Sequence, residues 1–333
     1  MPFKTPEFWY RPEKSEKPII ETLLTPVSYI YNIGHYINTS LQKPKSINIP
    51  VICIGNITAG GSGKTPTIIA LHKLLVKQKI FESPCFLSRG YGGSESQTRR
   101  IEDHEGANKV GDEPLLLASH SNTIISKNRY DGAYLAHDLG YDCVLMDDGF
   151  QNQTLHKDIS LVVIDGNNGF GNKKTIPAGP LREKIPNALK RTNAVILIGE
   201  DKTNVSSVIP NHIPIFSASI QASNLTQIDQ TQRYIAFAGL AHPKKFFNTL
   251  NKHNMNVIEF HEFADHHPYS QKDLESLLSK AEQEDSRLIT TEKDYQRIPN
   301  DLKNMVDILS IEIVFEDEKM VTEFLVERLK ENK

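Results

Sequence analysis

The chain has 333 residues, of which 38% are hydrophobic and 24% charged, and its formal net charge is −3. These values are typical of an ordinary globular protein with about two domains. The slightly acidic balance provides no basic field, which argues against a general nucleic-acid binder. Cys53, Cys85 and Cys143 lie within apolar runs and form no C-x-x-C pair, so we interpret them as core residues of a reducing compartment.

The first 45 residues differ in composition from the rest of the chain. Between Thr22 and Gln42 only His35 can carry a charge at neutral pH. Polar residues recur every three or four positions, which predicts one stripe along an otherwise apolar helix over about 19–41. Three interpretations remain open: a helix at the membrane interface, a helix packed on the protein body, or a true membrane span. The stripe contains Glu21, Thr25, Ser28, Asn32, His35 and Thr39.

A phosphate-binding loop is predicted directly after the apolar run 49–54. Residues 58–65 match the spacing G-x-x-x-x-G-K-[ST] except that Thr58 replaces the first glycine. Such a loop wraps a polyphosphate with backbone N–H groups; Lys64 would reach the phosphates, and Thr65 would place its hydroxyl on Mg²⁺. We therefore expect a nucleoside triphosphate to bind, and the lack of a Lys-x-Asp sequence for guanine favours ATP. The predicted loop residues are Thr58, Ala59, Gly60, Gly61, Ser62, Gly63, Lys64 and Thr65.

Apolar runs that alternate with helical patterns predict parallel β-α-β winding over 46–213. The fold class is therefore α/β, a P-loop NTPase-like, mostly parallel sheet with its ligands at the carboxyl ends of the strands. Predicted strands are 48–54, 83–88, 122–126, 141–147, 159–165 and 194–199, and predicted helices are 64–79, 113–120 and 128–139.

Acidic residues follow two of these elements. Asp147 and Asp148 end an apolar strand, as in the Walker B pattern that orders the Mg²⁺ shell. Asp112 and Glu113 open a helix, where an isolated acid is most often a cap. Their position after the second strand also suits contact with metal and acceptor. Arg89, Arg129 and Arg182 are candidates for charge stabilisation or phosphate binding.

A smaller α/β unit is predicted over 221–307. The runs 214–220 and 308–315 bracket it, and we expect them to pair as a two-stranded hinge between the domains. A final helix over 317–331 is expected to return to the first domain. The predicted elements of the small unit are strand 234–239, helix 243–253, strand 256–260, helix 271–283 and strand 286–291.

Histidines gather near position 265, where His266 and His267 follow Asp265 and His261 lies nearby. This spacing without cysteine is weak for zinc. An acid–base histidine or a surface pair is the better interpretation.

Seven motifs together resemble the tetraacyldisaccharide 4'-kinase family, the lipid A 4'-kinases of Gram-negative bacteria. The likeness covers essentially the whole chain in order, including the apolar N-terminal helix, and Thr58 matches the family's own form of the loop. The motifs are 55–66, Ser88–Gly92, Gly111–Pro114, Asp147–Gln151, Pro177–Glu183, Phe263–His267 and Thr290–Asp294.

The resemblance implies transfer of the ATP γ-phosphoryl group to the 4'-hydroxyl of a tetraacylated glucosamine disaccharide 1-phosphate. It implies Mg²⁺ as cofactor, the cytoplasmic face of the inner membrane as the location, and no nucleic-acid partner; we expect a monomer. An amphipathic helix beside the ATP site suits an acceptor whose acyl chains stay in the bilayer.

The resemblance also assigns roles to individual residues. Lys64, Thr65, Asp147 and Asp148 match nucleotide and metal positions. The catalytic cluster matches Asp112, Glu113, which we expect to bind metal, and His266, chosen over His267. Positions near acceptor or phosphate match Tyr91, Arg129 and Arg182, and we also expect Arg89 and Gln151 to bind the substrate.

Asp112 lies in the first predicted domain and His266 in the second. We expect the two side chains to meet across the cleft and to accept the acceptor's proton as a unit. Two rival functions share some of these features. A P-loop ATPase or metal chaperone would not need the lipid-facing helix, and a non-catalytic membrane scaffold would not need Lys64.

Overall fold

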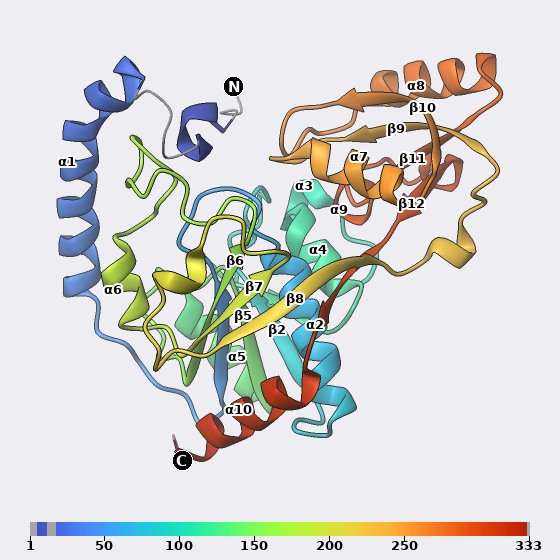
Figure 1. Ribbon diagram of the computed structural model, residues 1–333. Coiled ribbons are helices and arrows are strands. Elements are labelled where there is room, and N and C mark those ends of the chain that lie inside the picture. Colours follow the sequence, from blue (N-terminus) through green and yellow to red (C-terminus); the bar gives the residue numbers. More distant parts are fainter. Residues whose placement is uncertain (1–4, 12–17, 332–333) are drawn as a thin grey trace.

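A computed structural model describes residues 5–11 and 18–331 (Figure 1). Residues 1–4 and 12–17 of the predicted N-terminal region lie outside the described part. The chain forms a nine-stranded and a four-stranded sheet, in the orders β13-β8-β7-β6-β1-β5-β2-β4-β3 and β10-β9-β11-β12. This α/β architecture with a mostly parallel main sheet confirms the predicted fold class.

Strands of the large sheet follow the predicted runs closely. All its pairings are parallel except those of the two edge strands, β3 with β4 and β13 with β8. The strands are β1 (Val51–Gly55), β2 (Pro84–Ser88), β3 (Arg99–Arg100), β4 (Thr123–Ile125), β5 (Cys143–Asp147), β6 (Ile159–Asp165), β7 (Ala194–Ile198), β8 (Ile215–Ala222) and β13 (Ile311–Phe315).

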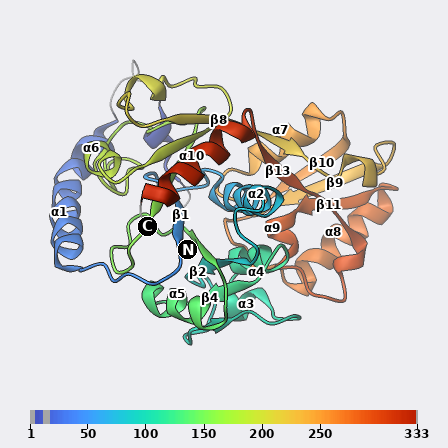
Figure 2. The ribbon, with the colours of Figure 1, turned by 90° about the horizontal axis from the view of Figure 1, so that it is seen from below.

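Helices cover both faces of this sheet, which explains why its central strands are apolar without alternation. One face packs on α5 (Arg129–Asp138) and α6 (Ile185–Leu189). The other face packs on α2 (Lys64–Lys77), α4 (Asp112–Ala118) and α10 (Glu318–Glu331). Figure 2, a view from below, shows α10 in front of the other elements. The last helix therefore returns to the large sheet, as predicted. The short α3 (Ala107–Val110) precedes α4.

The small unit is built on the four-stranded parallel sheet. Its two faces bury separate apolar clusters, one under α7 and one under α8. Its elements are β9 (Arg233–Ala238), α7 (Pro243–Lys252), β10 (Asn256–Glu262), α8 (Gln271–Gln283), β11 (Arg287–Thr291), α9 (Glu292–Tyr295) and β12 (Val306–Leu309). Short 3-10 turns occupy Glu7–Tyr10, Val205–Ser207, Leu225–Gln227 and Lys303–Met305.

The prediction of one hinge strand over 308–315 is wrong in part. The chain breaks at Ser310, so that β12 pairs with β11 in the small sheet and β13 pairs with β8 in the large one. The Asn224 side chain supports the break, because it accepts from the Ser310 N–H at 2.9 Å and donates to the Ile308 carbonyl at 2.8 Å. β8 also pairs with β7, so the two connecting strands belong to the edge of the large sheet.

Helix α1 (Ile19–Leu41) packs on the body through its polar stripe. Glu21 is buried and forms ion pairs with Arg11 at 3.0 Å and Lys174 at 3.2 Å. The Ser28 hydroxyl donates to the Thr175 carbonyl at 2.8 Å. Buried polar groups need such partners, so the stripe fixes the orientation of the helix.

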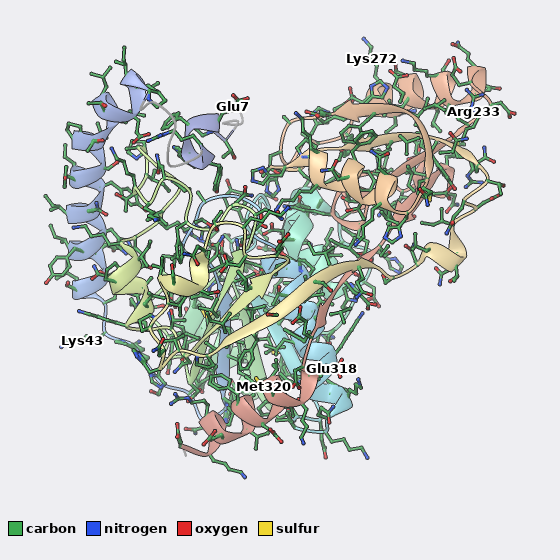
Figure 3. All side chains as sticks on the ribbon, in the orientation of Figure 1. Glu7, Lys43, Arg233, Lys272, Glu318 and Met320 are labelled. Carbon is green, nitrogen blue, oxygen red and sulfur yellow. The ribbon has the colours of Figure 1, made fainter. Side chains whose placement is uncertain are left out.

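The apolar face of α1 is turned outward, and Figure 3 shows side chains projecting away from the body along the helix. Leu23, Ile30 and Ile33 have exposed fractions of 69%, 71% and 61%. Within the described ranges, none of the helices combines the length and hydropathy required of a membrane span. The helix therefore packs on the body, which was one of the three interpretations left open by the sequence, and it presents an apolar surface on its outward face.

Candidate active site

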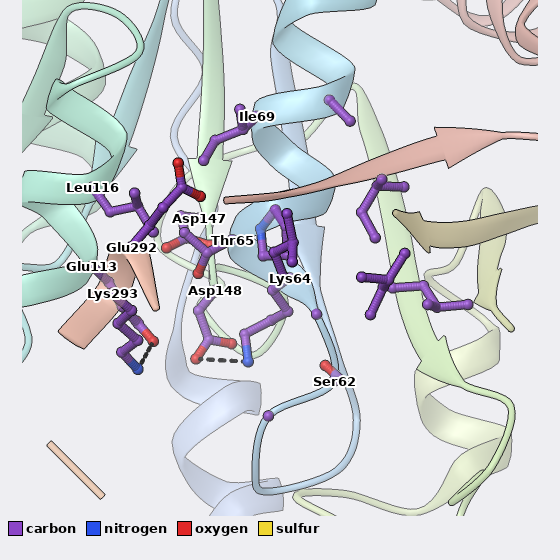
Figure 4. Close-up of a pocket in the computed structure, with 18 of the residues that line it drawn as sticks. Ser62, Lys64, Thr65, Ile69, Glu113, Leu116, Asp147, Asp148, Glu292 and Lys293 are labelled. Atoms are coloured by element: carbon purple, nitrogen blue, oxygen red, sulfur yellow. Dashed lines mark hydrogen bonds and ion pairs between the residues drawn. The ribbon is translucent and has the colours of Figure 1, made fainter. Parts of the chain in front are cut away.

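A cleft with a volume of about 1090 Å³ lies where the two sheets meet. The phosphate loop, the acids after β5, the start of α4 and strand β13 line it from the large sheet, and residues of α7 and α9 line it from the small unit (Figure 4). The carboxyl ends of parallel strands open toward it, as expected for this fold class.

The phosphate loop is shaped by hydrogen bonds that its sequence alone does not reveal. The Asn56 side chain donates to the Ser62 hydroxyl at 2.8 Å and closes the loop on itself. The Ala59 N–H donates to the Pro180 carbonyl at 2.7 Å, which ties the loop to the segment before Arg182. Gly63 has φ +88°, a left-handed conformation that favours glycine, and α2 begins at the next residue, Lys64. The loop is thereby held at a helix N-terminus, where anions bind.

Two neighbouring acids follow β5 in opposite electrostatic environments. Burial and the charges of Glu113 and Asp148 raise the pKa of Asp147 to about 7. Burial also acts on Asp148, but the charges of Lys64 and Arg182 outweigh it and lower the pKa of that carboxyl. Lys64 Nζ lies 3.7 Å and the Arg182 guanidinium 2.7 Å from Asp148. Asp148 adopts φ +46°, and this conformation directs its carboxylate differently from that of Asp147.

The donor set fits a magnesium ion. One carboxylate oxygen of Asp147, Oδ1, is buried without a hydrogen-bond partner, although buried polar atoms are normally paired. Across the described ranges no group of three or more His, Cys, Asp or Glu side chains forms a ready-made metal cluster. Magnesium keeps several waters and needs only one or two carboxylates besides phosphate oxygens. The Asp147 carboxylate and the Thr65 hydroxyl, which line the same cleft, are therefore a sufficient set of protein ligands.

Asp112 and His266 meet across the cleft. His266 Nδ1 lies 2.9 Å and 3.1 Å from the two oxygens of the Asp112 carboxylate. Burial would raise the pKa of Asp112, but the hydrogen bond from His266 and the charges of Lys293 and Arg297 lower it to about 2. The ionised carboxylate requires Nδ1 to carry a proton, so Nε2 is the acceptor nitrogen of the neutral ring. The predicted contact is therefore present in the structure.

Of this pair, His266 lines the cleft. Its side chain is 30% exposed, whereas that of Asp112 is 4% exposed and lies behind it. His266 has φ +57°, and its N–H donates to the Gly239 carbonyl at 3.1 Å. The edge of the Tyr91 ring faces the imidazole at a centroid distance of 5.8 Å.

The remaining predicted site residues divide by exposure. Arg129 is buried and donates to the backbone carbonyls of Asp147 at 3.1 Å and Ser126 at 3.4 Å, so its guanidinium supports the end of β5 from behind. The Gln151 side chain accepts from Arg182 at 3.3 Å. Exposed side chains at the edge of the cleft are Arg89 and Tyr91.

The other histidines of the predicted cluster have structural partners. His267 Nε2 lies 3.2 Å from Asp273, and its ring stacks against Phe263. His261 Nε2 lies 3.1 Å from Glu259. This arrangement agrees with a choice of His266, and the zinc interpretation has no support among the described residues.

Several residues of the site were given no role by the sequence. Lys293 Nζ lies 2.8 Å from Glu113, and Lys245 Nζ lies 2.5 Å from Asp165 at the end of β6. Both lysines belong to the small unit, so these ion pairs join the two sheets. The Lys157 ammonium donates to the carbonyls of the loop after Asp148. Lys157 and Lys245 belong to none of the sequence motifs, and Lys293 lies in the motif Thr290–Asp294 without an assigned role, so only the folded chain gives these lysines their partners.

A phosphate loop between a parallel strand and a helix, with a strand-end acid beside it, defines the class of P-loop nucleoside-triphosphate-binding α/β proteins. A family profile described as Tetraacyldisaccharide-1-P 4'-kinase matches residues 20–330. The chain therefore belongs to the tetraacyldisaccharide 4'-kinase family, the enzymes that carry out this kinase step in lipid A biosynthesis.

Individual relatives agree with this assignment. The tetraacyldisaccharide 4'-kinase of Rhodospirillum rubrum is 40% identical over 331 residues, 98% of each chain. That of Paramagnetospirillum magneticum is 39% identical over 96% of this chain and 97% of its own. A solved structure described as the "apo" form of LpxK from Aquifex aeolicus in complex with ATP is 26% identical, with a TM-score of 0.76 over 93% of this chain and 99% of its own. The family decides against the ATPase, metal-chaperone and scaffold alternatives.

Because its pKa is raised, the Asp147 side chain is predicted to lower the free energy of unfolding by an amount that depends on pH. Below about pH 4 the carboxyl is neutral in the folded and the unfolded chain, and between pH 4 and 7 ionisation of the unfolded chain alone lowers the free energy of unfolding. Asp147→Asn should therefore leave stability unchanged near pH 4 and increase it at pH 8, by up to about 4 kcal/mol at about 1.4 kcal/mol for each unit by which the pKa is raised.

Thermal or chemical unfolding in the presence of a metal chelator measures this difference. Asp301→Asn, at an exposed position that does not line the cleft, is the matched control. Equal stability of Asp147→Asn and the parent protein at pH 8 would contradict the raised pKa.

Proposed function

We propose that the chain binds Mg-ATP in the cleft and transfers the γ-phosphoryl group to the 4'-hydroxyl of tetraacyldisaccharide 1-phosphate, acting as a monomer at the cytoplasmic face of the inner membrane. The observation that carries the residue assignment is the contact of Asp112 with His266 in the same cleft as the phosphate loop. The Aquifex aeolicus relative described in complex with ATP supports ATP as the donor.

The loop 58–65 holds the phosphates in this proposal. Backbone N–H groups at the start of α2 surround them, and Lys64 contributes a positive charge. Residues that would hold Mg²⁺ are Thr65, Glu113, Asp147 and Asp148, of which Asp147 has the unpartnered buried oxygen. When bound, the ion neutralises charge on the β- and γ-phosphates. Of the two neighbouring acids, Asp147 is the one assigned to bind the ion directly, because Asp148 already pairs with Arg182.

We assign to His266 the role of accepting the proton from the acceptor hydroxyl. Its Nε2 belongs to the member of the pair that lines the cleft, and Nδ1 is already bonded to Asp112. The 4'-hydroxyl O–H bond breaks and an Nε2–H bond forms, while the hydroxyl oxygen bonds to the γ-phosphorus. The bond from that phosphorus to the bridging oxygen breaks, and ADP leaves with the electron pair. The Asp112 carboxylate then stabilises the imidazolium.

Arginines and polar side chains at the cleft position the acceptor. Arg182 lies between Asp148 and Gln151, where its guanidinium can balance charge that develops on the transferred group. Arg129 acts through the backbone of Asp147, which it supports. Arg89 and Tyr91, which are exposed at the cleft, are assigned to contact the acceptor.

Helix α1 serves as the membrane-facing element. Its outward face is apolar and contains tyrosines, and it adjoins a body that carries the kinase cleft. Burial of apolar area at a bilayer surface gives a reversible attachment. This places the enzyme where an acceptor with four acyl chains resides, without requiring the lipid to leave the membrane.

Loss of Lys64 or Thr65 is expected to abolish phosphoryl transfer while the protein remains folded, because both lie on the phosphate loop and not in the core. The assay is ATP-dependent phosphorylation of the disaccharide lipid by Lys64→Ala and Thr65→Ala at saturating Mg-ATP. Lys319→Ala, whose side chain is 85% exposed, is the control. Near-parental turnover in either loop variant would refute the site.

The outward face of α1 is expected to dominate binding to lipid vesicles. Ile30→Ser with Ile33→Ser should weaken the affinity at least about tenfold, because each buried methylene contributes about 0.8 kcal/mol. The control exchanges two similarly exposed residues elsewhere, Met305→Ser with Met320→Ser, which have exposed fractions of 53% and 54%. Equal flotation of the two double variants with vesicles would restrict α1 to a structural role.

A further inference from the structure

The segment Thr290–Asp294, at the junction of β11 and α9, has no role in the site as described so far. Asp294 is fully buried and accepts hydrogen bonds from the Gly239 N–H at 2.8 Å, the Tyr269 hydroxyl at 2.7 Å, the Thr291 hydroxyl at 2.6 Å and the Arg297 guanidinium. Four donors on one buried carboxylate fix the first turn of α9 in place. The residue before it, Lys293, therefore projects from a rigid base.

Lys293 reaches across the cleft to Glu113 of the large unit and also contacts His266 of its own unit. Its ammonium lies 2.8 Å from Glu113 Oε1 and 3.4 Å from His266 Nε2, and Figure 4 shows its ion pair with Glu113. The side chain is only 20% exposed. Burial would lower its pKa, but the charges of Glu113 and Asp112 raise it, so the group is a cation.

The imidazole of His266 is thus held from both sides. Asp112 accepts from Nδ1 at 2.9 Å, and Lys293 faces Nε2. Asp265 lies 3.9 Å from Nε2, and the Tyr91 ring makes a T-shaped contact with the imidazole. Because a cation can donate to Nε2 but cannot accept from it, the contact selects the ring orientation and tautomer in which Nε2 presents its lone pair to the cleft.

We propose that Lys293 is a positioning residue for phosphoryl transfer: its ammonium, anchored on Glu113, fixes the His266 ring so that Nε2 meets the acceptor hydroxyl. The inference rests on the proposed role of the Asp112–His266 pair. The incoming hydroxyl replaces Lys293 at Nε2, and the ammonium remains on Glu113. Lys293 therefore acts through His266 and does not touch the transferred atoms.

Substitution of Lys293 tests this assignment by the division between kcat and KM. Lys293→Met should lower kcat about 10- to 100-fold with the KM for ATP changed by less than about twofold, because ring placement matters only in the chemical step. Lys293→Arg, which keeps a cation of similar reach, should recover most of the loss. The control is Lys272→Met, on the exposed surface of α8 at the far edge of the small unit (Figure 3). An unchanged kcat, or a raised KM for ATP with kcat retained, would overturn the inference.

A double-mutant comparison separates action through His266 from action through Glu113. In a His266→Ala background, Lys293→Met should lower the remaining rate by less than about twofold. A further loss as large as that in the parent protein would overturn the inference and leave the proposed function intact. Parental kcat in His266→Ala alone would instead refute the proposed proton step.

Discussion

The hydrogen bond between His266 Nδ1 and Asp112, 2.9 Å long, is the contact on which the organisation of the site depends. Asp112 begins α4 in the large sheet's layer, and His266 follows β10 in the small unit, so neither unit contains the pair alone. The two ion pairs Glu113–Lys293 and Asp165–Lys245 join the same units beside it. Under the proposed function, the acid–base pair is complete only while the two units are in contact, which would protect ATP from water if the units separated.

Neighbouring carboxyl groups in this cleft differ in pKa because their surroundings differ. Asp147 and Asp148 are adjacent in sequence, but Lys64 and Arg182 form ion pairs with Asp148 whereas burial dominates at Asp147, and the pKa values of the two carboxyls move in opposite directions. A buried carboxylate oxygen without a protein partner is thereby available for a cation, and a charged carboxylate is available to orient Lys64. Helix α1 inverts the usual arrangement of a surface helix, because its polar groups face the body and its apolar side chains face outward.

Much of this could be read from the sequence, because the strongest signals are local. Strand runs such as 143–147 and the spacing of the phosphate loop identify elements wherever they occur, and the polar stripe of α1 indicates one buried edge. The sequence did not locate the break at Ser310, because the two halves of the run are equally apolar and only Asn224, 86 residues away, separates them. It also did not reveal the ion-pair partners of Lys293 and Lys245, because these partners belong to the other unit. Motif spacing brought Asp112 and His266 into one site, but burial alone decides which of them faces the cleft.

The central claim is that Asp112 and His266 act as one unit, and a double-mutant cycle on kcat tests it most directly. Asp112→Ala and His266→Ala should each lower kcat by about 10² to 10⁴ with little change in the KM for ATP, the range typical of lost acid–base catalysis. The double variant should be scarcely slower than the slower single variant, because either change removes the function of the pair. Losses that multiply in the double variant would show that the two residues work independently, and the account of a shared proton acceptor across the cleft would be wrong.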